Sequence, residues 1–201
     1  RAAYPKEDRE YAAVLKKLQE EGVRVRAEKK GILLLFGSLA TMDYVKGHSD
    51  LDTVFIISKE ACQSPKMLLE IRKDVAEIMR ESYFIDVLQH HGPYIFTEYD
   101  LEMFPQHYLP FAVWKNMVSL CGEVTLQFYE RETSSEELRE ELKRYKEMFL
   151  KIIETPLEKL PKSNYSRKYL YQAILLFPAV YLMAKGKPCY KRESFKEIRK
   201  Y

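Results

Sequence analysis

The alternation of hydrophobic and polar residues changes character about two thirds of the way along the chain. Before residue 130, short unbroken apolar runs typical of buried strands are interleaved with stretches in which apolar residues recur at helical spacing. After Thr133 only the helical spacing is found. This pattern predicts an α/β core over residues 1–130, with a mixed sheet and flanking helices, followed by a small helical C-terminal region over residues 131–201.

Four apolar runs in the first region predict strands. These are Ile32–Phe36, Leu51–Ser58, residues 82–89 and Val124–Tyr129. Around them the spacing predicts a helix over residues 6–21 that Gly22 ends, a helix that Ser64 caps and Pro65 opens, and a short helix over residues 110–120. Residues 90–108 carry turn residues and aromatics without a period, and they are predicted to form a long surface loop.

The C-terminal region has clear helix boundaries. Overlapping capping boxes at residues 133–137 predict the start of one helix, and Ser163 or Asn164 caps another that extends to about Lys185. This second helix is apolar almost all round, which favours burial in a bundle or in a homodimer interface formed by helix 164–185. A short charged helix is predicted over residues 194–200.

Composition and charge narrow the class of protein. The chain has 201 residues with 33 Lys and Arg against 30 Asp and Glu, so its charge does not indicate nucleic acid or a membrane surface as a partner. The longest apolar run, residues 173–184, is shorter than the roughly 20 residues that a membrane span needs. The three cysteines show no paired spacing, which favours free thiols and a cytoplasmic location.

The segment with the most chemical information joins the first two predicted strands. Gly37 and Ser38 follow the first strand directly, and Asp50-Leu51-Asp52 opens the second. A glycine at a strand end lets the backbone approach a ligand closely, and Ser38 adds a hydroxyl and an N–H group. Side chains two residues apart on a strand share a face, so both carboxylates are predicted to project together and to favour a bound cation such as Mg²⁺.

A third acid, Asp86, lies within the apolar run that predicts the third strand. A buried carboxylate without a partner is costly, so this strand, paired beside the second, would bring Asp86 to the other two carboxylates. His90 and His91 follow, but adjacent residues on a strand face opposite ways. They are therefore interpreted as surface or loop residues rather than as metal ligands.

Taken together, strand-Gly-Ser, a loop, Ser-Asp-Leu-Asp and a later hydrophobic-Asp-hydrophobic strand resemble the polymerase-β nucleotidyltransferase superfamily. The resemblance covers Ile32–Val87, and the short form is most similar to the small prokaryotic group. That group contains the aminoglycoside nucleotidyltransferases and the minimal, antitoxin-type enzymes. Each element alone has an ordinary interpretation as a turn, a strand entry or an edge-strand carboxylate, and their joint occurrence in this order favours the resemblance.

The resemblance implies transfer of a nucleoside monophosphate from a nucleoside triphosphate, ATP or another NTP, to an acceptor hydroxyl on a small molecule or a protein. It implies that Asp50, Asp52 and Asp86 are catalytic and bind Mg²⁺, or Mn²⁺ in its place, and that Gly37 and Ser38 bind the nucleotide phosphates. The alternative is a non-catalytic, antitoxin-like protein that uses the same fold to bind a helical partner. The presence of all three acids favours catalysis.

Overall fold

The computed structural model describes residues 9–89, 91–105, 109, 111–126, 130–131, 134–155 and 162–201. The chain divides into two compact units. The first comprises residues 1–104 and 116–129, and the second comprises residues 105–115 and 130–201. Among the helices in these described ranges, none is both long enough and apolar enough to cross a membrane.

The first unit contains a four-stranded mixed sheet, so its α/β class agrees with the sequence pattern. The strands lie in the order β3-β2-β1-β5 and span Tyr94–Thr97, Asp52–Ile57, Gly31–Phe36 and Val118–Ser119. β1 is antiparallel to both β2 and β5, whereas β2 and β3 are parallel. The predicted strands at 32–36 and 51–58 are thereby confirmed as β1 and β2.

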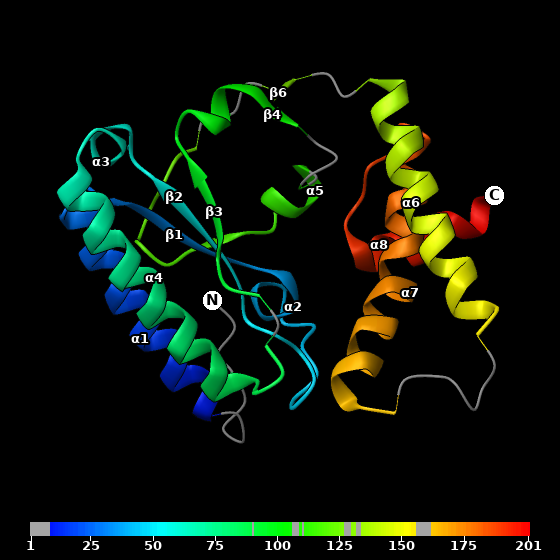
Figure 1. Ribbon diagram of the computed structural model, residues 1–201, viewed down its shortest axis with the longest axis horizontal. Coiled ribbons are helices and arrows are strands. Elements are labelled where there is room, and N and C mark those ends of the chain that lie inside the picture. The colour runs from blue at the N-terminus through cyan, green and yellow to red at the C-terminus, as the bar shows by residue number, and fades with distance from the viewer. Residues whose placement is uncertain are drawn as a thin grey trace. The chain divides into compact units, whose positions relative to one another are not determined.

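Two long helices cover one face of this sheet. α1 (Arg9–Ala27) and α4 (Pro65–Ile85) pack side by side along the strands (Figure 1). A short α3 (Lys59–Cys62) precedes α4. Their apolar stripes meet alternate strand residues in one continuous core; its fully buried members include Tyr11, Leu18, Leu33, Leu51, Phe55 and Ile78.

The other face of the sheet is also apolar in its middle. Val54 and Ile56 alternate with the core residues of β2 and are fully buried. In the β2–β3 register Ile56 lies opposite Phe96, whose ring meets Phe104 edge-on with centroids 5.2 Å apart. Asp52 shares the period of Val54 and Ile56, so its carboxylate belongs to the face that α1 and α4 do not cover.

A partly buried ion cluster links α1 and α4 to the turn that precedes β1. Lys30 is almost fully buried, and its Nζ lies 2.7 Å from Glu28 Oε2 and 3.1 Å from Asp74 Oδ2. Arg24 Nη2 lies 2.6 Å from the other Asp74 oxygen. Because the lysine and the aspartate are both buried, each depends on the other for compensation of its charge.

Several predicted boundaries are wrong. α1 passes through Gly22 and ends at Ala27; Gly22 instead allows close packing, because a Cβ there would lie 2.8 Å from the Leu120 carbonyl oxygen. The 82–89 segment is not a strand, since α4 continues to Ile85. The predicted loop 90–108 contains β3, the 3-10 helix η2 (Asp100–Met103) and the two-residue strand β4 (Phe104–Pro105).

The segment between the loop and the C-terminal region also differs from the prediction. The helix α5 spans only Phe111–Trp114, and β5 occupies part of the predicted helix 110–120. Residues 124–126 are not in a strand, and the rest of the predicted strand, 127–129, lies outside the described residues. A short β6 (Glu130–Arg131) pairs with β4 in a separate two-stranded sheet.

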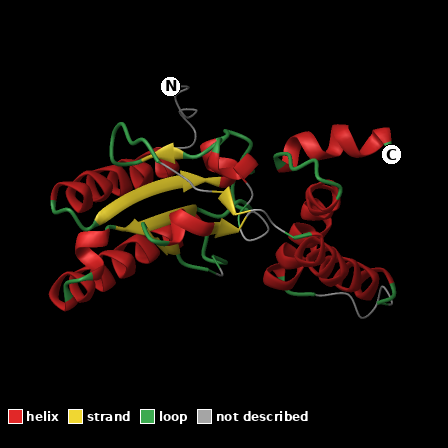
Figure 2. Cartoon of the chain, turned by 90° about the horizontal axis from the view of Figure 1, so that it is seen from above, coloured by secondary structure: helices red, strands yellow, loops and turns green. Residues whose placement is uncertain are grey.

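The second unit is mainly helical, as Figure 2 shows by colour. Besides the short α5, the described part of this unit contains α6 (Ser135–Ile153), α7 (Asn164–Ala184), α8 (Lys191–Glu197) and the 3-10 helix η4 (Ile198–Lys200). The capping box is confirmed: the Glu137 N–H donates to Ser134 Oγ, and the Ser134 N–H donates to the Glu137 carboxylate. α6 and α7 pack together, with Phe149 and Phe177 stacked at a centroid distance of 4.9 Å.

The end of α1 offers a test of local backbone strain. Lys29 has a φ of 57° and lies between two closing hydrogen bonds, from its own N–H to the Arg26 carbonyl and from the Lys30 N–H to the Val25 carbonyl. Lys29 therefore has the left-handed backbone conformation that commonly follows the end of an α-helix. Glycine is favoured at this position, because a Cβ is unfavourable in that conformation.

We therefore expect Lys29→Gly to raise the free energy of unfolding by about 1 kcal/mol. The side chain contributes little, since its ion pair with Glu60 at 3.7 Å is exposed on both sides. Lys29→Ala is the matched control, because it removes the same ion pair but keeps the Cβ. Equal stabilities of the two variants in urea unfolding would show that backbone strain is absent at this position.

Candidate functional site

The site that the sequence predicted lies where β1 ends and β2 begins. In the antiparallel register Phe36 is opposite Asp52, so Gly37, the first residue after β1, lies beside the first residue of β2. Gly37 and Ser38 then open the four-residue helix α2 (Gly37–Ala40) and are both partly exposed. The structure therefore brings Gly37, Ser38 and Asp52 together at one end of the sheet.

Gly37 is in direct contact with the Asp52 carboxylate. Its φ is +72°, and a Cβ added to it would lie 2.1 Å from Asp52 Oδ2. No side chain larger than hydrogen fits there without displacing the carboxylate. The close approach observed at Gly37 is to Asp52, and the approach to a ligand that the sequence predicts there stays a prediction.

Asp50 and Asp52 project to the same side of the chain, as predicted from their spacing. Leu51 between them is buried in the core toward α1 and α4. The two carboxylates both approach one imidazole nitrogen: His91 Nε2 lies 3.3 Å from Asp52 Oδ1 and 3.9 Å from Asp50 Oδ2. Their side chains keep about a fifth of their surface exposed, at 19% and 23%, so the pair is accessible from solvent.

His91 lies in a loop, as the sequence predicted, but next to the two acids, a position that sequence analysis missed. Its side chain is only 22% exposed. Nδ1 lies 3.0 Å from the Gly92 carbonyl oxygen, and the ring lies 5.7 Å from that of Tyr94. The hydrogen-bonded contact with Asp52 raises the pKa of His91, although burial acts in the opposite direction. His90 lies outside the described residues.

Gln89 holds the backbone of the segments that carry Asp50, Asp52 and His91. The Leu51 N–H donates to Gln89 Oε1 at 3.1 Å, and Gln89 Nε2 donates to the Leu51 carbonyl at 3.2 Å. The same Nε2 also donates to the His91 carbonyl at 2.9 Å. The buried amide thus pairs with the residue between the two acids as a neighbouring strand would, and it links that residue to the His91 segment.

We expect Gln89→Ala to lower the free energy of unfolding by about 2 kcal/mol, because the buried N–H and carbonyl of Leu51 lose their partner. Gln63→Ala, which removes an exposed amide, is the control and should change stability by less than about 0.5 kcal/mol. Urea unfolding of both variants measures the difference. A Gln89→Ala protein as stable as the control would show that the Leu51 backbone finds other partners.

Asp86 is not on a strand, because the predicted third strand is the end of a helix. It is the C-cap residue of α4: its N–H donates to the Ser82 carbonyl, and its Oδ1 accepts from the Leu88 N–H at 2.9 Å. The side chain is buried and supports the turn after the helix. The strand that lies beside β2 is instead β3, which His91 and Gly92 precede.

Asp50 and Asp52 are the residues of this site that could hold a divalent cation. Among the described residues, no three His, Cys, Asp or Glu side chains already surround a point where a metal ion would sit. The donor set is nevertheless suited to one, because two partly exposed carboxylates converge on a shared nitrogen. Asp50 and Asp52 supply the hard oxygen ligands that Mg²⁺ and Mn²⁺ take, and bound phosphate completes such sites.

Comparison with known proteins gives no family for this chain. No family model matches it, and neither a curated protein nor a solved structure matches it significantly.

Proposed function

We propose that the chain is a metal-dependent nucleotidyltransferase with a polymerase-β-like fold in its first unit. The observation that carries this proposal is the contact between Gly37 and Asp52, with Asp50 on the same side. Two elements of the resemblance are supported by the observed order: a strand followed directly by Gly-Ser, and an antiparallel strand with Asp-Leu-Asp at its start. The third element, a strand that carries Asp86, is absent, because Asp86 is the C-cap of α4.

The proposed roles follow from where the side chains lie. Gly37 and Ser38 hold the β- and γ-phosphates of the nucleoside triphosphate, ATP or another NTP, at the end of β1. Asp50 and Asp52 hold Mg²⁺ or Mn²⁺ next to those phosphates. When bound, the metal neutralises the triphosphate and stabilises the attacking and leaving oxygens of an in-line displacement.

In the proposed reaction an acceptor hydroxyl oxygen forms a bond to the α-phosphorus. The bond from that phosphorus to the bridging oxygen breaks, and pyrophosphate leaves with the electron pair. The hydroxyl proton passes to solvent or to a carboxylate at the exposed side of the site. Catalysis of this kind depends on positioning and charge neutralisation, which the fixed Gly37–Asp52 pair and the Gln89-held backbone favour.

The reaction is tested with ATP labelled in the α-phosphate, Mg²⁺, and a panel of aminoglycosides, cell-extract protein and tRNA. Transfer of label by the wild type, and its loss in the Asp50→Asn/Asp52→Asn double variant, is the expected result. Equal labelling by both proteins would contradict the proposal, because the label would then not depend on the two acids.

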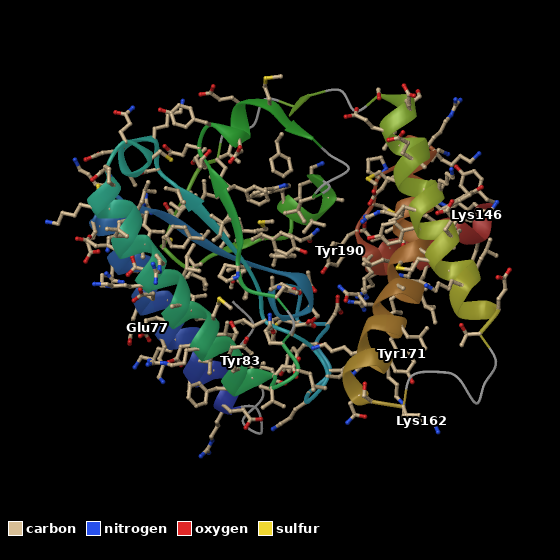
Figure 3. All side chains as sticks on the ribbon, viewed as in Figure 1. Glu77, Tyr83, Lys146, Lys162, Tyr171 and Tyr190 are labelled. Atoms are coloured by element: carbon tan, nitrogen blue, oxygen red, sulfur yellow. The ribbon has the colours of Figure 1, made fainter. Side chains whose placement is uncertain are left out.

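A second function, binding of a helical partner or of a second copy, is favoured by one feature of α7. Tyr171, Ile174 and Leu175 are spaced as neighbours on one helix face and are 48%, 39% and 38% exposed (Figure 3 labels Tyr171). Large apolar residues at this spacing are typical of interaction surfaces.

Self-association through this face predicts a dimer in sedimentation equilibrium that Ile174→Glu converts to a monomer. The substitution places a charge in the apolar contact, whereas Glu77→Gln at an exposed position of α4 (Figure 3) is expected to leave the dimer intact. A monomeric wild type would exclude the homodimer.

A further inference from the structure

We infer that His91 Nε2 is the third metal-binding donor of the site, beside Asp50 and Asp52, in the place that the sequence pattern assigned to Asp86. This inference rests on the proposed function, because it concerns the metal that the nucleotidyltransferase site would hold. The observations behind it are the position of the ring, the identity of the nitrogen that faces the acids, and the support around the ring.

The tautomer of His91 follows from its neighbour. A carbonyl oxygen can only accept a hydrogen bond, so the contact of Nδ1 with the Gly92 carbonyl at 3.0 Å requires a hydrogen on Nδ1. In the neutral ring the lone pair therefore belongs to Nε2, which faces the oxygens of Asp50 and Asp52. A lone pair facing carboxylate oxygens is stable only with a cation between them, either a proton or a metal ion.

The spacing of the three side chains suits a metal ion. Donors bound at about 2.1 Å to one octahedral ion lie about 3.0 Å apart when adjacent and about 4.2 Å apart when opposite. The distances from Nε2 to the Asp52 and Asp50 oxygens, 3.3 and 3.9 Å, fall within that range. Among the described residues no three such side chains surround one point as they stand, so binding of an ion requires these three to reorient.

The ring is held in this orientation before any metal binds. Metal-binding histidines commonly donate their second nitrogen to a backbone carbonyl, as His91 does to Gly92. Gln89 holds the His91 carbonyl, and the Tyr94 ring lies next to the imidazole. By contrast, the Asp86 carboxylate caps the turn at the end of α4 through the Leu88 N–H.

A nitrogen donor changes which metal the site prefers. Imidazole raises the affinity for Mn²⁺ and later divalent metals more than the affinity for Mg²⁺, which prefers oxygen ligands throughout. The wild type should therefore favour Mn²⁺ over Mg²⁺, and His91→Asp, which restores an all-oxygen donor set, should reduce that preference several-fold.

The test is calorimetric titration of the full chain with Mn²⁺ and with Mg²⁺, in the presence of α,β-methylene-ATP, which cannot release pyrophosphate. We expect His91→Ala to weaken Mn²⁺ binding at least about tenfold. His48→Ala removes an exposed imidazole, and Asp86→Asn keeps an oxygen for the Leu88 N–H. Both controls should bind Mn²⁺ as the wild type does.

A second measurement needs no variant to fold well. Long-range ¹H–¹⁵N correlation of the wild-type imidazoles should show the hydrogen on His91 Nδ1, and addition of Zn²⁺ as a diamagnetic probe should shift Nε2 and leave Nδ1 protonated. If Zn²⁺ binds to the protein but the ¹⁵N chemical shift of His91 Nε2 does not change, the inference is overturned.

The outcomes separate this inference from the proposed function. Tighter Mn²⁺ binding by His91→Ala would show that the ring competes with the metal as an internal cation, and unchanged binding would show that it plays no part. Either result overturns the role of His91 and leaves the two aspartates as ligands. A wild type that binds neither metal, with or without nucleotide, would remove the proposed nucleotidyltransferase as well.

Discussion

Replacing Asp52 by Asn is expected to lower the rate of nucleotidyl transfer at least about 1000-fold, equivalent to about 4 kcal/mol of transition-state stabilisation. Asp52 is the acid that contacts both Gly37 and His91, so it stands between the proposed phosphate-binding residues and the other donors. The amide has nearly the same shape as the carboxylate but no charge for a divalent cation. Single-turnover transfer of label from α-labelled ATP measures the loss.

The same substitution should change the free energy of unfolding by no more than about 1 kcal/mol, because the carboxylate is partly exposed. Glu20→Gln, at an exposed position on α1, is the matched control and should keep full activity. If Asp52→Asn transferred nucleotide within about tenfold of the wild type, its carboxylate would not be a metal ligand in the transition state.

Gly37→Ala is expected to reduce transfer at least about 100-fold, even though only one methyl group is added. The methyl would be 2.1 Å from Asp52 Oδ2, so the carboxylate must move away from the end of β1. The backbone at φ +72° also becomes strained, at a cost of about 1–2 kcal/mol in unfolding free energy.

Gly47→Ala separates these two effects. Gly47 has a φ of +73°, almost that of Gly37, but an added Cβ would have nothing within 4 Å. Both variants should lose similar stability in urea unfolding, and only Gly37→Ala should lose activity and metal affinity. Equal activity of the two variants would show that the close approach of Gly37 to Asp52 has no functional consequence.

The sequence predicted the fold well where the pattern of apolar residues is compatible with only one kind of secondary structure. An unbroken apolar run such as Leu33–Phe36 is stable only when both of its faces are buried, and β1 and β2 occupy the middle of the sheet. The helix starts at Ser64 and within residues 133–137 were also predicted correctly, because a serine hydroxyl there accepts from the N–H three residues later.

The run 82–89 was misassigned because its apolar residues are mostly not buried. Tyr83, Phe84 and Val87 are 47%, 66% and 83% exposed, whereas Ile85 is buried. A helical signal was present, since the buried positions continue the spacing of Ile78 through residues 82 and 85. Apolar composition alone could not show it, because a short apolar run suits a strand and the end of a helix equally.

The sequence predicted the site residues that lie at the ends of β1 and β2. It did not predict His91, which a tertiary contact brings to them. Gly37 and Asp52 are brought together by the β1–β2 register, which the strand ends imply. His91 reaches the acids because β3 lies parallel beside β2 after the long α4, and no local pattern reveals that pairing. The one available signal was the alternation of polar Gln89 and His91 just before the short run Tyr94–Phe96.

Paramagnetic NMR tests most directly whether the end of β1 and the start of β2 form one site for metal and nucleotide. Substoichiometric Mn²⁺ is added to ¹⁵N-labelled protein saturated with α,β-methylene-ATP, and the loss of each amide signal is recorded. We predict that broadening centres on Gly37, Ser38, Asp50 and Asp52 and disappears in Asp50→Asn/Asp52→Asn. Broadening centred elsewhere, or unchanged in the double variant, would contradict the account.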